Sequence, residues 1–264
     1  MTPKVEPRLI VDELGIESGD VLFIKASMNH LAFGPRETLD LLESLVERVG
    51  REGTILMPSF PYPNEVGRPR EDAVFDVRRS PSQMGLITEM FRRLDGTVRS
   101  EHFWVPACAR GRLARWFCEG QETVLNPFGA GSTYRRLVEQ PTKMLGLGVT
   151  ANYNILAHVA DAVLHERYPF EIFLKEPVTG RLRGYDGRER AMRSILVSQD
   201  RRLRMKPSAL IPLSPPLAAA HRFFNHQGGF VWSLPGPLFF EEALRLGTAA
   251  LDAGRLPPWL GAQA

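Results

Sequence analysis

A histidine and an aspartate three residues apart are the side chains in this sequence best suited to moving a proton. His158 and Asp161 lie within residues 155–164, whose apolar spacing predicts a helix, so both stand on one helix face. An imidazole acts as a general base near neutral pH, and a neighbouring carboxylate orients its ring or stabilises its charged form. A polar helix face with a hydrogen-bonded histidine fits the same pattern, so the spacing alone leaves both interpretations open.

The other histidines give weaker signals. His165 follows Asp161 on the same predicted helix, but the order H-E-x-x-H of a zinc-binding helix is absent, so we expect no bound metal. The histidines that match no motif are expected at the surface or in packing contacts, and they are His30, His165, His221 and His226.

A second group of polar residues follows a predicted strand. The apolar run 20–24 predicts a buried strand, and Lys25 and Ser27 stand at its end, where open α/β sheets bind ligands. A serine nucleophile is a further option for Ser27, although no G-x-S-x-G turn surrounds it. Residues 34–38 then open a helix whose backbone N–H groups suit an anion, with Arg36 beside them; helix capping explains these residues almost as well.

Three apolar runs predict the strands that position these groups, at residues 20–24, 53–58 and 144–149. The helix between Gly34 and Gly50 connects the first two strands, and a strand, helix and strand within about forty residues form a right-handed parallel crossover. Residues 59–81 predict a long loop, and loops of this length are often functional. Beyond residue 168 the pattern changes to short β-like pieces, such as 177–182 and 194–197. The sequence therefore predicts an α/β fold with a central mixed, largely parallel sheet flanked by helices, and a smaller β-containing C-terminal portion.

The bulk composition excludes several classes of protein. The chain has 264 residues, of which 44% are hydrophobic and 24% charged, as in ordinary globular proteins. Two cysteines give no disulfide framework, and no apolar stretch reaches the length of a membrane span, so we expect a soluble cytoplasmic protein. The net charge is +3, but the basic residues are scattered and no nucleic-acid-binding motif is present. We therefore expect neither nucleic acid nor membrane as a partner.

Five segments between about residues 15 and 165 carry a pattern that is stronger together than any one of them alone. These segments are 19–28, 53–60, 75–76 with 80–85, 99–102 with 107–111, and 148–161. In this order and at these distances they resemble the signature segments of the aminoglycoside 3-N-acetyltransferase (antibiotic N-acetyltransferase) family. The chain resembles a diverged member.

The resemblance implies an enzyme that moves an acetyl or other acyl group from acetyl-CoA, or another acyl-CoA, to an amine of an amino sugar, aminocyclitol or related small molecule. The family pair that matches His158 and Asp161 is His and Glu, and it is taken as catalytic. His158 is therefore the expected general base, and Asp161, one methylene shorter than Glu, its support. His102 matches a family site histidine as well, although a structural histidine bonded to backbone fits its position equally.

The resemblance assigns further residues to the two substrates. The residues expected near CoA are Ser27 and Lys25 at the thioester or pantetheine arm, and Gly34 and Arg36 at the pyrophosphate. The residues expected near the acceptor are Asp76, Asn154 and Glu101, of which Asp76 alternatively caps a turn. Residues 170–264 carry little of the family pattern, and we expect them to shape substrate specificity within a single domain spanning 1–264.

Departures from the family pattern bear on the substrate. Lys25 replaces a His of the family, Pro106 a Ser and Ile155 a Thr. Polycationic aminoglycosides prefer acidic clefts, whereas this chain is basic, so a biosynthetic enzyme that acylates another amine, amino sugar or hydroxyl is equally supported. The alternatives are an enzyme of the same fold that hydrolyses or cyclises an acyl group, and a non-catalytic binding protein. Both a monomer and a homodimer remain compatible with the sequence.

Overall fold

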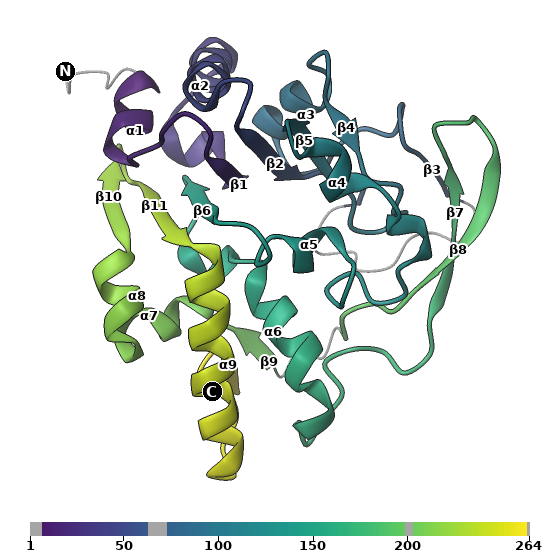
Figure 1. Ribbon diagram of the computed structural model, residues 1–264, viewed down its shortest axis with the longest axis vertical. Helices are drawn as coiled ribbons and strands as arrows, with labels where there is room; N and C mark the ends of the chain where they lie inside the picture. Colours follow the sequence, from purple (N-terminus) through teal and green to yellow (C-terminus); the bar gives the residue numbers. More distant parts are fainter. Residues whose placement is uncertain (1–6, 63–72, 199–202, 263–264) are drawn as a thin grey trace.

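A mixed β-sheet forms the centre of the protein, whose computed structural model describes residues 7–62, 73–198 and 203–262 (Figure 1). Within these residues the sheet has seven strands, which in spatial order are β10 (Arg222–His226), β11 (Gly229–Pro235), β6 (Thr142–Leu147), β1 (Val21–Ala26), β2 (Thr54–Pro58), β5 (Ala107–Gly111) and β4 (Val98–Arg99). The three predicted strands are confirmed as β1, β2 and β6, which are adjacent and parallel in the middle of the sheet.

The α/β class and the mixed sheet are confirmed, but the expectation of a largely parallel sheet is wrong. Among the described strands, β1 pairs in parallel with β2 and β6, and the other four pairings of this sheet are antiparallel. For two of these pairs, β10–β11 and β4–β5, the connection is too short for the crossover of a dozen or more residues that a parallel pair needs. The turn between β10 and β11 contains only Gln227 and Gly228, both with positive φ, as in a tight antiparallel hairpin.

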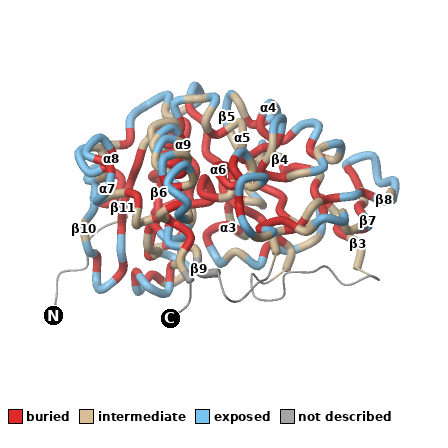
Figure 2. Tube along the Cα trace, turned by 90° about the horizontal axis from the view of Figure 1, so that it is seen from below, coloured by how far each residue is buried: buried red, intermediate tan, exposed pale blue. Residues whose placement is uncertain are grey.

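Helices cover both faces of the sheet. The helices on one face are α1 (Pro7–Glu13), α2 (Pro35–Val49) and α3 (Leu86–Arg92), and those on the other are α4 (Ala114–Cys118), α5 (Thr133–Arg136), α6 (Leu156–Leu164) and α9 (Gly236–Asp252). Strand β1 packs on both helix layers. Leu22 and Ile24 are buried in the apolar cluster with α1, α2 and α3, and Val21 and Phe23 are buried in the cluster with α4, α5, α6 and α9. This burial on both faces explains why the parallel strands are continuous apolar runs, and Figure 2 shows the buried chain between the exposed outer segments.

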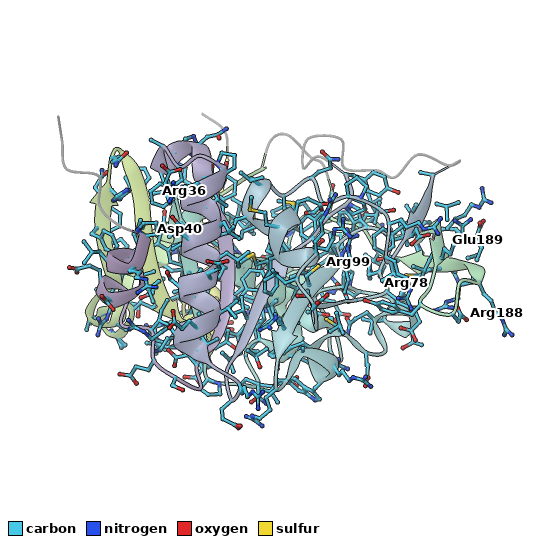
Figure 3. The ribbon with its side chains drawn as sticks, turned by 90° about the horizontal axis from the view of Figure 1, so that it is seen from above. Arg36, Asp40, Arg78, Arg99, Arg188 and Glu189 are labelled. Carbon is cyan, nitrogen blue, oxygen red and sulfur yellow. The ribbon has the colours of Figure 1, made fainter. Side chains whose placement is uncertain are left out.

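Two smaller sheets lie outside the central one in the described residues. The first contains β3 (Val74–Asp76), β7 (Val178–Arg183) and β8 (Glu189–Ser194), and the second contains β9 (Leu203–Met205) and β12 (Leu260–Ala262). The β-like piece predicted at 177–182 corresponds to β7, whereas 194–197 mostly follows β8 and contributes a single bridge from Val197 to Phe173. Figure 3 shows Arg188 and Glu189 at the outer end of the β7–β8 hairpin.

The C-terminal third is joined closely to the rest of the chain. Strands β10 and β11 extend the central sheet beside β6, and α9 packs against α6. Short helical segments complete the described fold, namely η1 (Met28–Leu31), η2 (Gln121–Thr123), η3 (Ala151–Tyr153), η4 (His165–Arg167), η5 (Pro207–Ala209), α7 (Leu210–Leu213) and α8 (Pro215–Ala220). In the residues that can be described, no helix combines the length and apolar character needed to cross a membrane.

A tryptophan fixes the contact between β11 and β6. The buried Trp232 lies opposite Gly146, and a Cβ atom added to this glycine would lie 2.0 Å from the indole Nε1. The same Nε1 donates a hydrogen bond of 2.7 Å to the carbonyl of Val149, in the loop that leads from β6 to α6. The absence of a side chain at Gly146 therefore lets the indole hold the loop that precedes His158.

Substituting Gly146→Ala should lower the free energy of unfolding by about 1–3 kcal/mol, because the new methyl group overlaps the indole and forces the two strands apart. Urea denaturation measures the change. Gly34→Ala serves as the control, since its Cβ would meet only the far end of the Glu37 side chain, and it should cost about 1 kcal/mol or less. Equal losses in the two variants would contradict the packing role of Gly146.

Candidate active site

Two adjoining cavities open at the carboxyl ends of the parallel strands. One, of about 370 Å³, is lined by His158 and is called the His158 cavity; the other, of about 830 Å³, is lined by Ser27 and is called the Ser27 cavity. The residues that line both are Lys25, Asn152, Tyr153 and Met205. Ligand sites are common at this edge of an open α/β sheet, and here the loops after β1, β2 and β6 converge on it.

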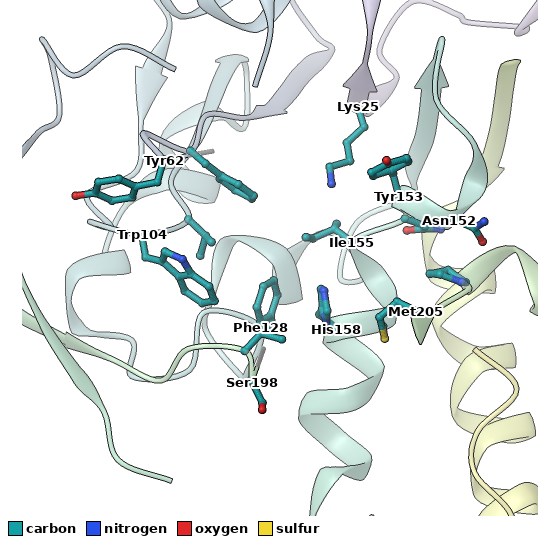
Figure 4. A pocket seen from close by; sticks show the side chains of 15 residues that line it. Lys25, Tyr62, Trp104, Phe128, Asn152, Tyr153, Ile155, His158, Ser198 and Met205 are labelled. Atoms are coloured by element: carbon teal, nitrogen blue, oxygen red, sulfur yellow. The ribbon is translucent and has the colours of Figure 1, made fainter. Parts of the chain in front are cut away.

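His158 reaches its cavity from the first turns of α6 (Figure 4). Its side chain is 23% exposed, and its ring lies 5.0 Å from that of Phe128. One turn along the helix, the fully buried Asp161 places Oδ2 3.5 Å from Nδ1 of His158. The aspartate therefore approaches the imidazole despite being one methylene shorter than glutamate.

The carboxylate of Asp161 is held from two sides. Its Oδ1 accepts a hydrogen bond of 2.9 Å from the Tyr168 hydroxyl and another of 2.9 Å from the indole N–H of Trp259. Burial and the carboxylate itself raise the pKa of Tyr168, which keeps this phenol protonated as a donor. In the described part of the chain, Oδ2 has no hydrogen-bond donor and faces only Nδ1 of His158. This arrangement favours a proton on Nδ1 and leaves Nε2 as the basic atom.

Lys25 extends from the end of β1 and lines both cavities. Its Nζ lies 5.5 Å from the centre of the Tyr153 ring, within the range of a cation–π contact. Burial lowers the pKa of Lys25 to about 8. Figure 4 shows this side chain pointing into the space that His158 enters from the other side.

The Ser27 cavity is shaped by a close approach of two loops. Gly148 has a φ of 74°, and a Cβ on it would lie 2.2 Å from the carbonyl oxygen of Ser27. His30 makes a hydrogen bond of 2.9 Å through Nδ1 to the Gly148 carbonyl, and it lines the cavity as well. No sequence signal places His30 here, because it belongs to no motif and its partner lies 118 positions away.

Asn154 lines the His158 cavity and lies between η3 and α6, two residues before the first residue of α6. Its Oδ1 accepts a hydrogen bond of 3.1 Å from the backbone N–H of Leu156, while its buried Nδ2 has no partner in the described residues. Asn154 thus lines the same cavity as His158, and its contact with the acceptor stays a prediction.

His102 does not line either cavity. It is 2% exposed, and its Nδ1 accepts hydrogen bonds from the backbone N–H groups of Trp104 and Val105, at 3.2 and 3.1 Å. Its Nε2 lies 3.3 Å from the Ser194 hydroxyl, and burial lowers the pKa of His102 to about 3. The geometry matches the structural alternative, in which this neutral histidine shapes the turn that brings Trp104 to the His158 cavity.

Two other residues expected near the acceptor are also engaged elsewhere. Asp76 accepts hydrogen bonds of 3.0 Å from the backbone of Arg78 and Arg79, so it caps a turn. Glu101 pairs with Arg190 and accepts a hydrogen bond from the Tyr185 backbone, which fastens the β7–β8 hairpin. Neither carboxylate lines the two cavities.

The start of α2 is likewise separate from the cavities. Gly34 is the N-terminal cap of the helix, and Arg36 is exposed in its first turn, one turn from Asp40 (Figure 3). Neither Gly34 nor Arg36 lines either cavity, so the structure brings Lys25 and Ser27 together but leaves this expected anion site apart.

Aromatic residues line much of the His158 cavity, and sequence reasoning did not identify them. They are Phe60, Tyr62, Trp104, Phe128 and Tyr153. The first residues of the loop predicted at 59–81 reach the cavity, whereas 63–72 lie outside the described residues. Aromatic side chains present apolar ring faces and polar edges, and such a lining suits a ligand ring that has both apolar and polar surface.

Replacing His102→Asn should flatten the dependence of stability on pH. In the wild type, the unfolded chain takes up a proton on this histidine below about pH 6.5, whereas the folded protein does so only near pH 3. Stability should therefore fall as pH is lowered through this window, by up to about 1.4 kcal/mol per pH unit. The asparagine keeps an acceptor for the turn but does not titrate, so urea unfolding from pH 7 to 4 should show a smaller slope. Parallel pH profiles for the two proteins would refute the assignment.

Comparison with known proteins gives a consistent result. A family model described as aminoglycoside 3-N-acetyltransferase matches residues 23–202. The chain is similar to aminoglycoside N(3)-acetyltransferase IV of Salmonella sp, with 27% identity over 157 residues, or 59% of this chain and 57% of the relative. It is also similar to aminoglycoside N(3)-acetyltransferase III of Salmonella sp, with 29% identity over 168 residues, or 58% of each. These matches thus cover less than two thirds of the curated relatives.

Solved structures agree over most of the chain. The aminoglycoside acetyltransferase AAC(3)-Xa has a TM-score of 0.73 and 22% identity, with 92% of this chain and 91% of that one covered. A likeness at this identity shows the fold, and the family model spans well over half of the sequence. The chain belongs to the aminoglycoside 3-N-acetyltransferase family.

Proposed function

We propose that this protein transfers an acetyl or other acyl group from a CoA thioester to an amine of an amino sugar, an aminocyclitol or a related metabolite. The observation that carries the proposal is the pairing of His158 with the buried Asp161 in a cavity that adjoins a second, larger one. A base in one cavity and room for a long thioester in the other are what a transfer between two substrates requires.

The Ser27 cavity is the proposed place for the pantetheine arm. It lies at the ends of β1 and β6, and the absence of a side chain at Gly148 lets the backbone of the two loops approach closely beside it. A structural neighbour, AAC-IIIb, with a TM-score of 0.71 and 18% identity, has been solved as a binary complex with CoASH. A CoA thioester entering from this side would deliver its acyl carbon to the boundary with the His158 cavity.

The reaction needs two proton transfers, one when the amine attacks the thioester and one when the thiolate leaves. The amine nitrogen attacks the thioester carbonyl carbon while Nε2 of His158 accepts a proton from that nitrogen, and the carbonyl π electrons move onto the oxygen. The C–S bond then breaks as the oxygen pair returns, and the proton passes to the departing thiolate. Asp161 stabilises the imidazolium between these steps through Nδ1, with its own charge held by Tyr168 and Trp259.

The acceptor is proposed to bind among the aromatic side chains of the His158 cavity. AAC(3)-IVa, another structural neighbour, has been solved in complex with a gentamicin and with apramycin, which supports a ring-bearing amine as the acceptor class for this fold. Residues from the C-terminal third contribute to the same walls, namely Val197, Ser198, Met205 and Pro207. This supports the proposal that residues 170–264 shape acceptor specificity.

The first experiment follows free thiol released from acetyl-CoA in the presence of glucosamine, 2-deoxystreptamine or gentamicin. His158→Ala should reduce amine-dependent release by about 10²–10⁴-fold while CoA still binds. His165→Ala is the matched control, because this histidine follows the same helix, contacts Phe173 and lies outside both cavities. Thiol release without any amine would indicate hydrolysis, and full activity of the His158 variant would reject the proposed base.

Asp161→Asn tests the charge and the tautomer rather than the packing. The amide oxygen can still accept from Tyr168 and Trp259, which turns the NH₂ group toward Nδ1 of His158. The proton then moves to Nε2, and the rate of thiol release should fall by about 10²–10⁴-fold with little loss of thermal stability. Asp161→Glu, which restores the family residue, should retain more activity. Equal rates for the wild type and the asparagine variant would exclude a role for the carboxylate.

A further inference from the structure

We propose that Lys25 binds the carbonyl oxygen of the acyl group and stabilises the negative charge that develops there during transfer. This inference rests on the acyl transfer proposed above and assigns a catalytic group that the family pattern does not supply, since the family has a histidine at this position. The family pattern therefore gives no precedent for an ammonium group here.

The position of Lys25 is the first argument. It is the next-to-last residue of β1, and it is one of four residues that line both cavities. The sulfur of a thioester in the Ser27 cavity and an amine in the His158 cavity can meet only at their boundary. The reacting carbonyl must therefore lie beside the residues that the cavities share. Figure 4 shows Lys25 and His158 entering this space from different elements.

The shared residues are not equivalent as partners of an oxyanion. The Asn152 side-chain oxygen accepts two hydrogen bonds from Ser208, which ties this residue to η5. Met205 offers a thioether, and Tyr153 lies under the lysine with its ring. Lys25 is the one cation among the four, and its ammonium carries three donors that can turn toward an oxygen.

The unpaired charge of Lys25 is the second argument. Within the described residues its Nζ contacts the Tyr153 ring but no carboxylate. Lys143, on the neighbouring strand β6, has a counter-ion. Its Nζ lies 2.6 Å from a carboxylate oxygen of Asp20 and 3.0 Å from the carbonyl oxygen of Gly15. A half-buried ammonium without a counter-ion loses hydration in the resting protein and gains little in return. The same charge becomes favourable when a negative oxygen forms beside it.

The protonation state agrees with this role. With a pKa of about 8, most of the Lys25 side chains carry the proton at neutral pH. The lysine keeps its three protons throughout the reaction, because His158 accepts the proton of the amine and returns it to the thiolate. His158 therefore transfers the proton, and Lys25 stabilises the negative charge on the carbonyl oxygen.

Kinetics and a carbonyl spectrum test the proposal together. Lys25→Met should lower kcat for amine-dependent thiol release by about 10²–10³-fold, as expected for the loss of one oxyanion donor. Lys25→Arg, which keeps the charge, should retain part of the rate. Lys175→Met, at an exposed lysine outside both cavities, is the matched control and should leave the rate unchanged. Thermal melting verifies that each variant folds, and Lys25→Gln replaces Lys25→Met if the latter does not.

The infrared carbonyl stretch of acetyl-CoA labelled with ¹³C at the thioester carbonyl gives a readout that needs no acceptor. Binding to the wild type should move the stretch to lower wavenumber than in free acetyl-CoA, and the shift should be lost in Lys25→Met. An unchanged shift in the variant, or a kcat within about threefold of the wild type, would overturn the role of Lys25 while leaving acyl transfer intact. Failure of the wild type to bind acetyl-CoA in calorimetry would instead overturn the proposed function, and the inference with it.

Discussion

A fully buried carboxylate needs hydrogen-bond donors, and the donors that the protein supplies to Asp161 govern the arrangement around the site. Tyr168 supplies one donor from the residue after η4, and Trp259 supplies another from the segment after α9. The remaining oxygen is left to His158. The helix that carries His158 and the distant segment that carries Trp259 are therefore held together by one charge, and the orientation of the imidazole is a consequence of that packing.

The parallel centre of the sheet has a corresponding role for the substrates. Because β1, β2 and β6 run in the same direction, the loops that follow them gather at one edge and form both cavities. The antiparallel hairpin β10–β11 reaches the same edge, because Gly228, Gly229 and Phe230 line the Ser27 cavity. Trp232 on β11 contributes indirectly, because its contact with Gly146 and Val149 holds the loop between β6 and α6.

The sequence predicts well the structural features that depend on a few neighbouring residues, such as a buried strand or the spacing of side chains on a helix. The buried runs of β1, β2 and β6 are evident because both faces are covered, and the proximity of His158 and Asp161 follows from helical spacing. Features that depend on distant partners are not accessible. Nothing local reveals that His102 turns its nitrogens toward the backbone, that Gly34 stands apart from the cavities, or that Trp259 reaches α6. Two edge strands escape prediction because β4 has only two residues and β10 is mostly exposed.

The hydrogen bond between Trp259 and Asp161 can form only late in protein synthesis, because it joins residues 98 positions apart. A ribosome adding about 5–20 residues per second needs about 5–20 s to cover this interval, far longer than a helix takes to form. The nascent chain thus contains Asp161 for seconds before Trp259, the donor of one of its two hydrogen bonds, is synthesised. The set of donors around the carboxylate is therefore completed only after the C-terminal segment has been synthesised.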